Sequence, residues 1–412
     1  MKSIIFGFVL VLSMSAYGGG LSAPFSMGST KVLPKGIRSF QVSGIITTVD
    51  SWYNDTGVTS GVAEPFSQQL SYARLLKAEK SENLKLNVES QLANKGVDLN
   101  TIAGTSYADI NTRVVATVPT FAYGLNENWT IALAVPIVYT NLDVATGFVG
   151  SEQLQQLVSD FSKKSRKQTK LIESKLQDVI ATEISNKGYK PLVDEEKTQV
   201  GDLTMVAKFL AYKGLNASWA ITNKFTFPTA KTNDVTKVVD PTAGDGQFDY
   251  GVTSTVVVPV NAKLNLIQEI GYTFQFSDTR ETRIPISEAE RLSSDTDYGA
   301  SRDLGDSMFN SFGAQLSPNE SIAFGATYTI AYKQRDQWRG TQASADRYRV
   351  LGFQTEQFMQ AFYFQTSVSS IDAYKKKRFP IPLTATVGVG KVTDGRNIRN
   401  DPLWSMNMSM YF

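Results

Sequence analysis

The sequence predicts an all-β protein, a transmembrane antiparallel β-barrel of about 12 strands with long external loops that contain helical insertions. Three observations predict it. Much of the chain alternates apolar with small or polar residues, the connections alternate between long and short, and the last residues form an amphipathic strand that ends in two aromatic residues. Successive side chains of a strand point to opposite faces, so the alternation gives each strand one apolar face.

The composition limits the chemistry open to this chain. It has 412 residues, and 41 Lys and Arg against 39 Asp and Glu leave a net charge of +2, which argues against nucleic-acid binding. Histidine and cysteine are both absent, which excludes thiol and histidine catalysis, zinc–thiolate sites and disulfides. We therefore expect no enzyme activity, no catalytic residue, no resident metal and no cofactor.

The first residues form a targeting segment. Residues 1–18 place Lys2 before an apolar run at Ile4–Leu12 and end on the small-x-small sequence of 16–18, which is typical of a secretory signal peptide. No later run reaches the ~18 apolar residues of a membrane helix. If the exported chain crosses a bilayer, it crosses as strands.

Residues 19–37 are rich in glycine and proline, which do not suit a regular helix or strand. This segment either folds into the lumen as a plug or lies loose in the periplasm. The barrel itself is expected over 38–412.

The alternation is clearest in two segments. The odd positions of Trp129–Tyr139 and the even positions of Ser321–Lys333 are mostly large and apolar. Both are long enough to cross the membrane at a tilt, which takes ~9–11 residues, and aromatic residues stand near strand ends as in the girdles of outer-membrane barrels. Further strands are expected near 38–49, 112–124, 203–209, 218–227, 248–258, 264–276, 308–316, 356–369, 383–390 and 404–412.

The connection lengths give an independent argument. Transmembrane barrels have short periplasmic turns and longer external loops, and an even number of strands places both termini in the periplasm. The short turns are 125–128, 214–217, 261–263 and 317–320, and the long loops are about 50–111, 143–201, 231–247, 277–305, 336–353 and 393–402.

Two of the long loops have helical patterns. Apolar spacing predicts helix over 151–188 and, more weakly, over 66–96. These insertions either form a lid that gathers ligands or only cover and stiffen the rim. A run of basic residues in the first insertion is either a solvated face or binds phosphates of lipopolysaccharide. The run consists of Lys163, Lys164, Arg166, Lys167 and Lys170.

One loop contains three acidic residues. Asp240, Asp245 and Asp249 lie in DPTAGDGQFD, just before a strand. Carboxylates and carbonyl oxygens suit calcium, but the spacing is not that of an EF-hand. Asp and Gly in turns are the better explanation.

The alternation also selects the side chains that point into the lumen. Charges are costly on the lipid face, so strand positions that carry them are expected to face inward. These side chains either line an open path or pair with one another and fill the barrel, because twelve strands lie between the filled eight-stranded and the open sixteen-stranded types. The predicted lumen-lining residues are Thr204, Lys208, Thr222, Lys224, Asp249, Glu269, Gln315 and Lys333.

The chain ends on Tyr411 and Phe412, after an alternating strand. A final amphipathic strand that ends in phenylalanine resembles the assembly signal of bacterial outer-membrane proteins. This resemblance implies that the barrel-assembly machinery is a partner.

Four segments together resemble one family of outer-membrane proteins. They are VGDLTMVAKF (200–209), FTFPTAKTNDV (225–235), GDGQFDYGVTSTVVVPV (244–260) and LNLIQEIGYTFQF (264–276). They are similar to the meta-pathway phenol-degradation family, which is related in style to fatty-acid and aromatic-hydrocarbon transporters. Ala230 stands where that family usually has glycine, and the insertion at 151–188 is unusual for it.

The resemblance implies a passive channel for small, often apolar molecules. We therefore expect a channel of the bacterial outer membrane that takes up small molecules passively, hydrophobic or aromatic ones among them. Outer-membrane lipids and lipopolysaccharide are the expected surroundings. The alternative is a non-conducting structural or surface-interaction barrel whose loops bind a partner or lipopolysaccharide.

Overall fold

The computed structural model describes residues 27–64, 67–78, 82–164, 179–288 and 290–412. The expected signal peptide at 1–18, the first part of the 19–37 segment and most of the basic run in the 151–188 insertion lie outside these residues.

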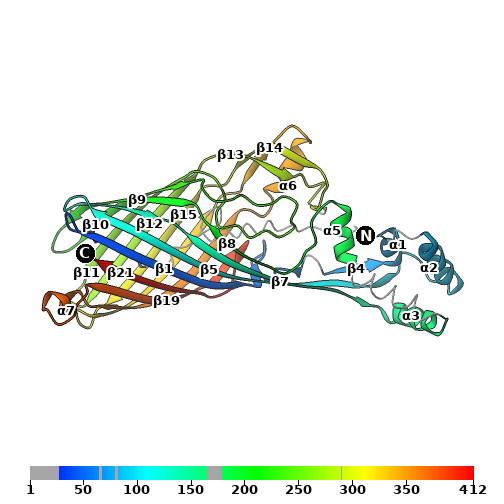
Figure 1. Cartoon of the computed structure of the whole chain (residues 1–412), viewed down its shortest axis with the longest axis horizontal. Coiled ribbons are helices and arrows are strands. Elements are labelled where there is room, and N and C mark those ends of the chain that lie inside the picture. Colours follow the sequence, from blue (N-terminus) through cyan, green and yellow to red (C-terminus); the bar gives the residue numbers. More distant parts are fainter. Residues whose placement is uncertain (1–26, 65–66, 79–81, 165–178, 289) are drawn as a thin grey trace.

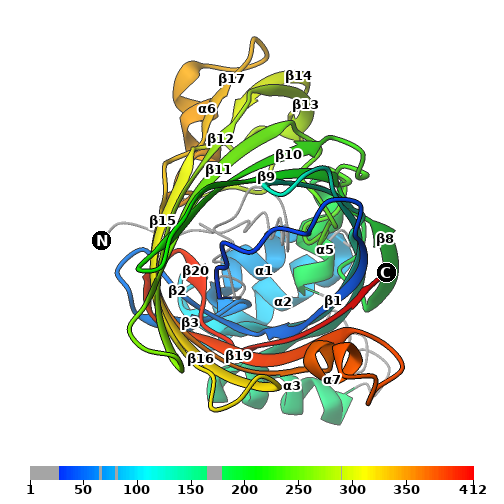
Figure 2. The ribbon, with the colours of Figure 1, turned by 90° about the vertical axis from the view of Figure 1, so that its left-hand side faces the viewer.

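An antiparallel sheet closes on itself to form the barrel (Figure 2). The closure is made by β1, which pairs with β21 on one side and β5 on the other, so that Phe40 faces both Met410 and Phe121. Twelve strand positions form the ring, which confirms the predicted fold. In ring order they are β1 (Arg38–Val49), β21 (Leu403–Tyr411), β19 (Leu383–Arg396), β18 (Gln357–Ser369), β16 (Ile322–Lys333), β15 (Ser307–Leu316), β12 (Leu264–Gln275), β11 (Asp249–Pro259), β10 (Ser218–Phe227), β9 (Leu203–Lys213), β6 (Trp129–Ala134) and β5 (Ile102–Gly124).

The apolar face of each strand points outward. On β21, Trp404, Met406 and Met408 are 51–59% exposed, whereas Ser409 between Met408 and Met410 is buried. A closed sheet has no free edge, and its outer face can therefore meet lipid without unpaired backbone groups.

Three of the short turns are stabilised by the same type of hydrogen bond, from backbone N–H groups to an asparagine side chain. The side-chain oxygen of Asn126 accepts hydrogen bonds from the backbone of Asn128 and Trp129 at 2.9 and 3.0 Å. Asn261 and Asn319 do the same two and three residues further on. Asparagine thereby stabilises a turn through its own side chain, which explains why these connections are short.

Some strands differ from the sequence expectation. The predicted strand Trp129–Tyr139 breaks at Pro136, which has no backbone N–H to donate, into β6 and β7 (Ile137–Gly150). β5 begins at Ile102 and not near 112, because its first half pairs with the prolonged β7. The loops expected at 50–111 and 143–201 are therefore shorter in the structure, because residues 102–111 belong to β5 and residues 143–150 belong to β7.

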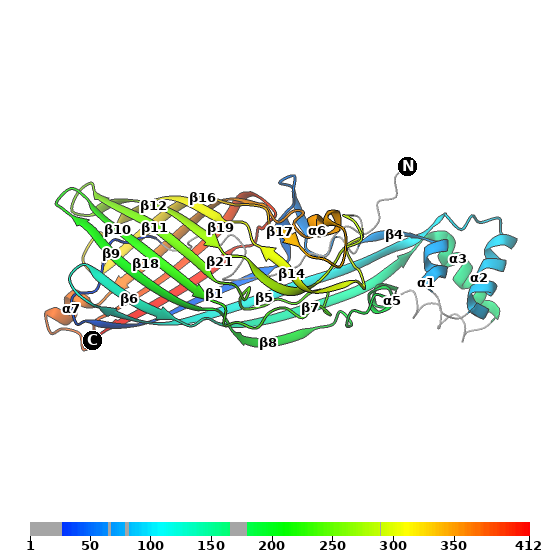
Figure 3. The ribbon, with the colours of Figure 1, turned by 90° about the horizontal axis from the view of Figure 1, so that it is seen from above.

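The prolonged strands carry a separate external body (Figures 1 and 3). Its helices are α1 (Tyr72–Ala78), α2 (Glu82–Asn94), α3 (Glu152–Lys164) and α5 (Val179–Asn186), and its added strands are β4 (Gln68–Ser71) and β8 (Glu195–Val200). The four helices and β4 share one hydrophobic core with the prolonged β5 and β7, in which Leu92, Ile110 and Ile184 are almost fully buried. The helices lie beyond the end of the barrel in Figure 1, and α1, α2 and α5 fall within its outline in Figure 2.

No helix in the described parts of the chain has the length and apolar character needed to cross a membrane.

Shorter elements complete the outer rim and one turn. The remaining elements are β2 (Ser51–Tyr53), β3 (Thr59–Gly61), β13 (Asp278–Arg283), β14 (Thr296–Asp303), β17 (Gln337–Arg339), α6 (Ala345–Leu351), α7 (Ile371–Lys375) and β20 (Ile398–Arg399).

Candidate solute pathway

The register of the sheet places all eight predicted lumen residues on its inner face. Directly paired residues of neighbouring strands share a face, and the pairs Thr204↔Thr226, Lys208↔Thr222, Lys224↔Gly251, Asp249↔Gln275, Glu269↔Ser311, Gln315↔Gly325 and Lys333↔Ser307 lie opposite the exposed apolar side chains.

These eight residues do not form one cluster. Lys333, which is only 1% exposed, pairs with Asp336 at the outer end of β16. Asp249 accepts a hydrogen bond of 2.9 Å from Gln247 at the outer end of β11. Lys333 is thus neutralised locally by an ion pair, and Asp249 is stabilised by a hydrogen bond from a neutral amide.

Residues 27–35 run inside the barrel, where Figure 2 shows the segment before β1 within the ring of strands. We call this segment the strap. Its Met27 backbone N–H lies 3.4 Å from Gln365 on β18. Further along, Thr30 lies 2.6 Å from Ser218 on β10, and the Leu33 N–H donates to Thr130 on β6 at 2.7 Å. The strap therefore passes along the wall from β18 through β12, β10 and β9 to β6.

Two of the predicted lumen charges bind the strap. Lys208 donates to the carbonyl oxygen of Ser29, and Glu269 accepts the Gly28 N–H and a 3.1 Å hydrogen bond from Thr255. A Cβ atom on Gly28 would overlap the Glu269 carboxyl group, so a larger residue here would displace that carboxylate from the strap. The charges of β9 and β12 are thus engaged with the chain itself.

The wall that the strap leaves uncovered is neutral. On β1 and β21, Ser43 accepts from Gln41 at 3.0 Å and from Asn407 at 2.9 Å, and Ser409 donates to Gln41 at 3.2 Å. Across β19, Tyr363 of β18 forms a 2.8 Å hydrogen bond with Ser405 of β21. This row of hydroxyl and amide groups was not singled out from the sequence, although the alternation of β21 contains it.

At the outer end of β9 lies a contact that sequence reasoning missed. Asp202, 3% exposed, accepts the N–H groups of Thr229 and Ala230 through one carboxylate oxygen, at 2.9 and 2.8 Å. Its other oxygen lies 3.4 Å from the Gly246 N–H. We call this the Asp202 clasp. It joins three of the motifs that carry the family resemblance, GDL, PTA and GDG.

The Asp202 clasp holds the loop 228–248 against the inner wall. A Cβ on Gly244 would overlap both the Asp202 carboxylate and the Ala230 methyl group. Because Gly244 has no side chain, the alanine at position 230 fits beside it. Further along, Ala243 packs with Val114 and Val138 of β5 and β7. The loop therefore covers the inner side of the barrel mouth.

Asp245 in this loop is buried and one of its carboxylate oxygens has no hydrogen-bond partner among the described residues. Burial raises the pKa of Asp245 to about 6, against the opposing effect of the Arg302 guanidinium. Asp240 forms an ion pair with Lys197 of β8. In the part of the chain that the structure describes, no three acidic side chains are placed to hold a metal ion, and the acidic loop is accounted for by pairing and turns.

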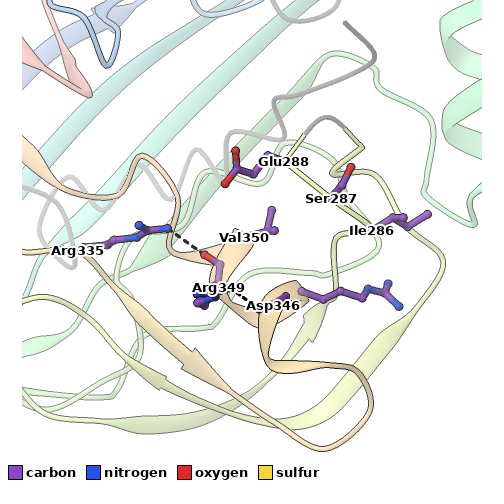
Figure 4. Close-up of a pocket in the computed structure, with 8 residues that line it drawn as sticks. Ile286, Ser287, Glu288, Arg335, Asp346, Arg349 and Val350 are labelled. Carbon is purple, nitrogen blue, oxygen red and sulfur yellow. Dashed lines mark hydrogen bonds and ion pairs between the residues drawn. The ribbon is translucent and has the colours of Figure 1, made fainter. Parts of the chain in front are cut away.

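A hollow of about 460 Å³ lies among the outer loops, next to α6 (Figure 4). Arg335, Arg347 and Arg349 line it together with Asp346 and Glu288. The arginines are engaged by backbone carbonyls and by acidic side chains. The hollow belongs to the rim and not to the inner face of the barrel.

The closed barrel, with its apolar outer face and polar inner face, defines a transmembrane barrel of the outer-membrane type. Residues 91–356 match the family described as Putative MetA-pathway of phenol degradation, and the chain belongs to this family. No curated protein sequence matches it significantly.

A solved structure of an outer membrane channel supports this fold. The COG4313 outer membrane channel from Pseudomonas putida F1 is similar with a TM-score of 0.54 and 11% identity, covering 94% of this chain and 99% of that chain. The Pseudomonas putida toluene transporter TodX gives a TM-score of 0.34 at 10% identity, covering 96% of this chain and 97% of that chain.

Proposed function

We propose that this protein is a passive channel of the bacterial outer membrane for small uncharged molecules with an aromatic or other apolar part. The observation that carries the proposal is the inner face of the barrel, where the strap engages Lys208 and Glu269 and leaves a neutral hydroxyl and amide wall on β1 and β21. The family description, which names phenol degradation, supports the same class of solute, and the outer membrane channel of similar fold supports a channel.

The mechanism needs no covalent step. A solute enters between the external body and the loop 228–248, and then passes between the strap and the β1–β21 wall. Hydroxyl and amide groups offer hydrogen bonds to a polar substituent, while the absence of a free charge along that wall favours neutral molecules over ions. Two of the predicted lumen residues, Lys208 and Glu269, act here as anchors of the strap.

In this proposal the strap narrows the lumen, which favours the plug alternative for residues 27–37. The test is single-channel conductance of refolded protein in planar bilayers, comparing the native chain with a variant that lacks 27–35. Larger ohmic steps in the variant are expected. Equal steps in both would refute a strap that narrows the path.

Solute selectivity needs a separate measurement. Swelling of liposomes that contain the native channel should be faster with phenol than with benzoate, which has a similar ring but carries a charge. Equal rates for the two solutes, in liposomes that outpace empty ones, would refute selection by a neutral wall.

A second candidate is the surface-interaction barrel, which the external body favours because its own core stabilises helices over the barrel mouth. Deleting 151–188 separates the two functions. Altered uptake would support the channel, whereas lost binding to lipopolysaccharide with unchanged permeability would support the interaction role.

We also propose that the C-terminal residues act as an assembly signal. Phe412 exchanges backbone hydrogen bonds of 2.8 and 3.0 Å with Arg38, and its ring lies 6.5 Å from that of Phe121. The C-terminal Tyr411 and Phe412 therefore stand at the seam where the ring closes, which suits a signal read by the barrel-assembly machinery.

A further inference from the structure

The connection between β18 and β19, residues 370–382, differs in charge from the other connections at the periplasmic end of the barrel. It carries four consecutive cations, Lys375, Lys376, Lys377 and Arg378. The short turns 125–128, 214–217, 261–263 and 317–320 together contain a single lysine. We call residues 370–382 the basic turn. The positive charge of the connections at this end is therefore concentrated at one point of the ring.

The basic turn lies at the edge of the apolar outer face. It begins two residues after Val368 of β18, whose side chain is 52% exposed on that face, and it ends directly before Leu383 of β19. Figure 2 looks onto this end of the barrel and shows α7, which is part of the turn, beside the ring of strands and not over its opening. Because the outer face meets lipid, the basic turn stands where hydrocarbon gives way to lipid headgroups.

Hydrogen bonds and one lysine hold the basic turn in place. The Ser370 hydroxyl group accepts the Leu383 N–H at 2.9 Å, which joins the two ends of the turn. Lys376 forms ion pairs with Asp372 at 2.6 Å and with Glu320 of the neighbouring turn at 3.5 Å. The charge of Lys376 is thus used within the chain, and the position of the turn relative to the barrel is fixed.

The other three cations are not used in this way. Lys375, Lys377 and Arg378 are exposed and form no ion pair within the part of the chain that the structure describes. Lys377 has a left-handed backbone with φ of 56°, a conformation in which glycine is more favourable than lysine. The local backbone therefore does not account for a lysine at this position, and the three charges are available to a partner outside the chain.

Exposed apolar side chains accompany these cations. Tyr374, Phe379 and Ile381 are 45%, 43% and 42% exposed. Basic residues together with aromatic and aliphatic ones are typical of segments that lie in a membrane interface, where the cations meet anionic headgroups and the apolar groups enter the acyl boundary. A soluble acidic partner would match the charges but would leave the apolar side chains in water, so the lipid surface is the better match.

We propose that the basic turn binds anionic phospholipids of the periplasmic leaflet, with Lys375, Lys377 and Arg378 contacting phosphate groups and Phe379 and Ile381 inserted at the acyl boundary. This inference does not depend on the proposed channel function. It requires only the closed barrel and the contact of its outer face with lipid.

Native mass spectrometry of the full-length barrel tests the proposal. Refolded protein in detergent is given equal amounts of phosphatidylglycerol and phosphatidylcholine with the same acyl chains, and the retained lipids are counted. Each cation near an anionic surface contributes about a fivefold factor. The native protein should therefore prefer phosphatidylglycerol at least about tenfold, and the triple variant Lys375→Gln, Lys377→Gln and Arg378→Gln should lose this preference.

A matched control removes the same charge from other positions. Lys35, Lys213 and Lys263 are exposed and stand singly at the same end of the barrel, and replacing all three by glutamine should leave the preference intact. No preference in the native protein, an unchanged preference in the first triple variant, or an equal loss in both triple variants would overturn the proposal.

A second measurement separates a lipid surface from a site for soluble phosphates. Phe379→Ser with Ile381→Ser keeps all the cations and should lower the retention of phosphatidylglycerol about tenfold, while heat modifiability on a gel shows that the barrel remains folded. Glycerol phosphate, compared with chloride at the same ionic strength, should not displace the lipid from the native protein. Displacement by glycerol phosphate, or native retention in the serine variant, would refute binding to a lipid surface.

Discussion

The Asp202 clasp makes a quantitative prediction about the loop 228–248. In Asp202→Ala the Thr229 and Ala230 N–H groups lose a carboxylate acceptor at 2.9 and 2.8 Å. Each hydrogen bond to a charged group contributes about 1.5–3 kcal/mol, and part of this is offset because the buried carboxylate no longer has to be desolvated. We expect the free energy of opening the loop to fall by about 3–4 kcal/mol, since the 3.4 Å contact to Gly246 adds little.

Limited trypsin digestion of the folded protein measures this opening. Lys231 lies directly after the clasped Ala230, and cleavage there requires local opening of the loop. When opening and closing are fast relative to cleavage, the rate follows the population of the open loop. A loss of 3–4 kcal/mol therefore raises the cleavage rate by about 100- to 1,000-fold, at 1.4 kcal/mol for each factor of ten.

Two controls decide the interpretation. Cleavage after Lys376, in the connection that follows α7, should not change, because it lies far from the clasp in the chain. Asp202→Asn keeps one acceptor oxygen with weaker, neutral hydrogen bonds, and about a tenfold increase is expected. If Asp202→Ala is cleaved after Lys231 within a factor of two of the native protein, the clasp does not hold the loop.

Three further predictions concern pH, the strap and assembly. The pKa of Asp245 is about 6 in the folded loop against 3.8 ordinarily, so protonation favours the folded loop. The free energy of opening the loop, measured by amide hydrogen exchange corrected for its intrinsic pH dependence, should be greatest below pH 3.8 and fall by at most about 3 kcal/mol as the pH rises through about 6. This dependence should be lost in Asp245→Asn. Lys208→Met removes the hydrogen bond to Ser29, and single-channel records should then flicker between the native conductance and the larger steps of the strap deletion, whereas steady native steps would contradict the anchor. Phe412→Ala should lower the yield of heat-modifiable barrel several-fold in cells, as measured on gels of outer-membrane fractions, and an unchanged yield would refute the assembly signal.

The parity of the strands could be predicted from the sequence because it is a local property. Period-two alternation in segments such as Trp404–Phe412 gives the face of every side chain once the strand is assigned. The inward position of Lys208 and Glu269 follows from that rule alone. Their binding to Ser29 and Gly28 does not, because the strap is irregular and its contacts span more than a hundred residues of sequence.

The same limit explains the errors at the outer rim. The external loops were recognised by their length and helical spacing, but the extension of β5 to Ile102 depends on pairing with β7. The alternation from Thr105 to Arg113 is present in the sequence, yet its outward side chains are mostly polar, because this part of the hairpin faces water and not lipid. A sequence prediction that requires an apolar outer face therefore assigns only the part of β5 that lies in the membrane and misses its extension beyond the membrane.

The family motifs gain a physical meaning from the Asp202 clasp. GDL, PTA and GDG lie up to 44 residues apart, and each alone indicates only a turn. In the structure Asp202 accepts from the other two motifs, and Gly244 leaves room for the carboxylate. Because the clasp fixes the loop 228–248 over the inner wall, these motifs determine the shape of the barrel mouth. A change of solute would therefore be made more readily in the loop beyond the clasp or in the neutral wall of β1 and β21 than in the motifs themselves.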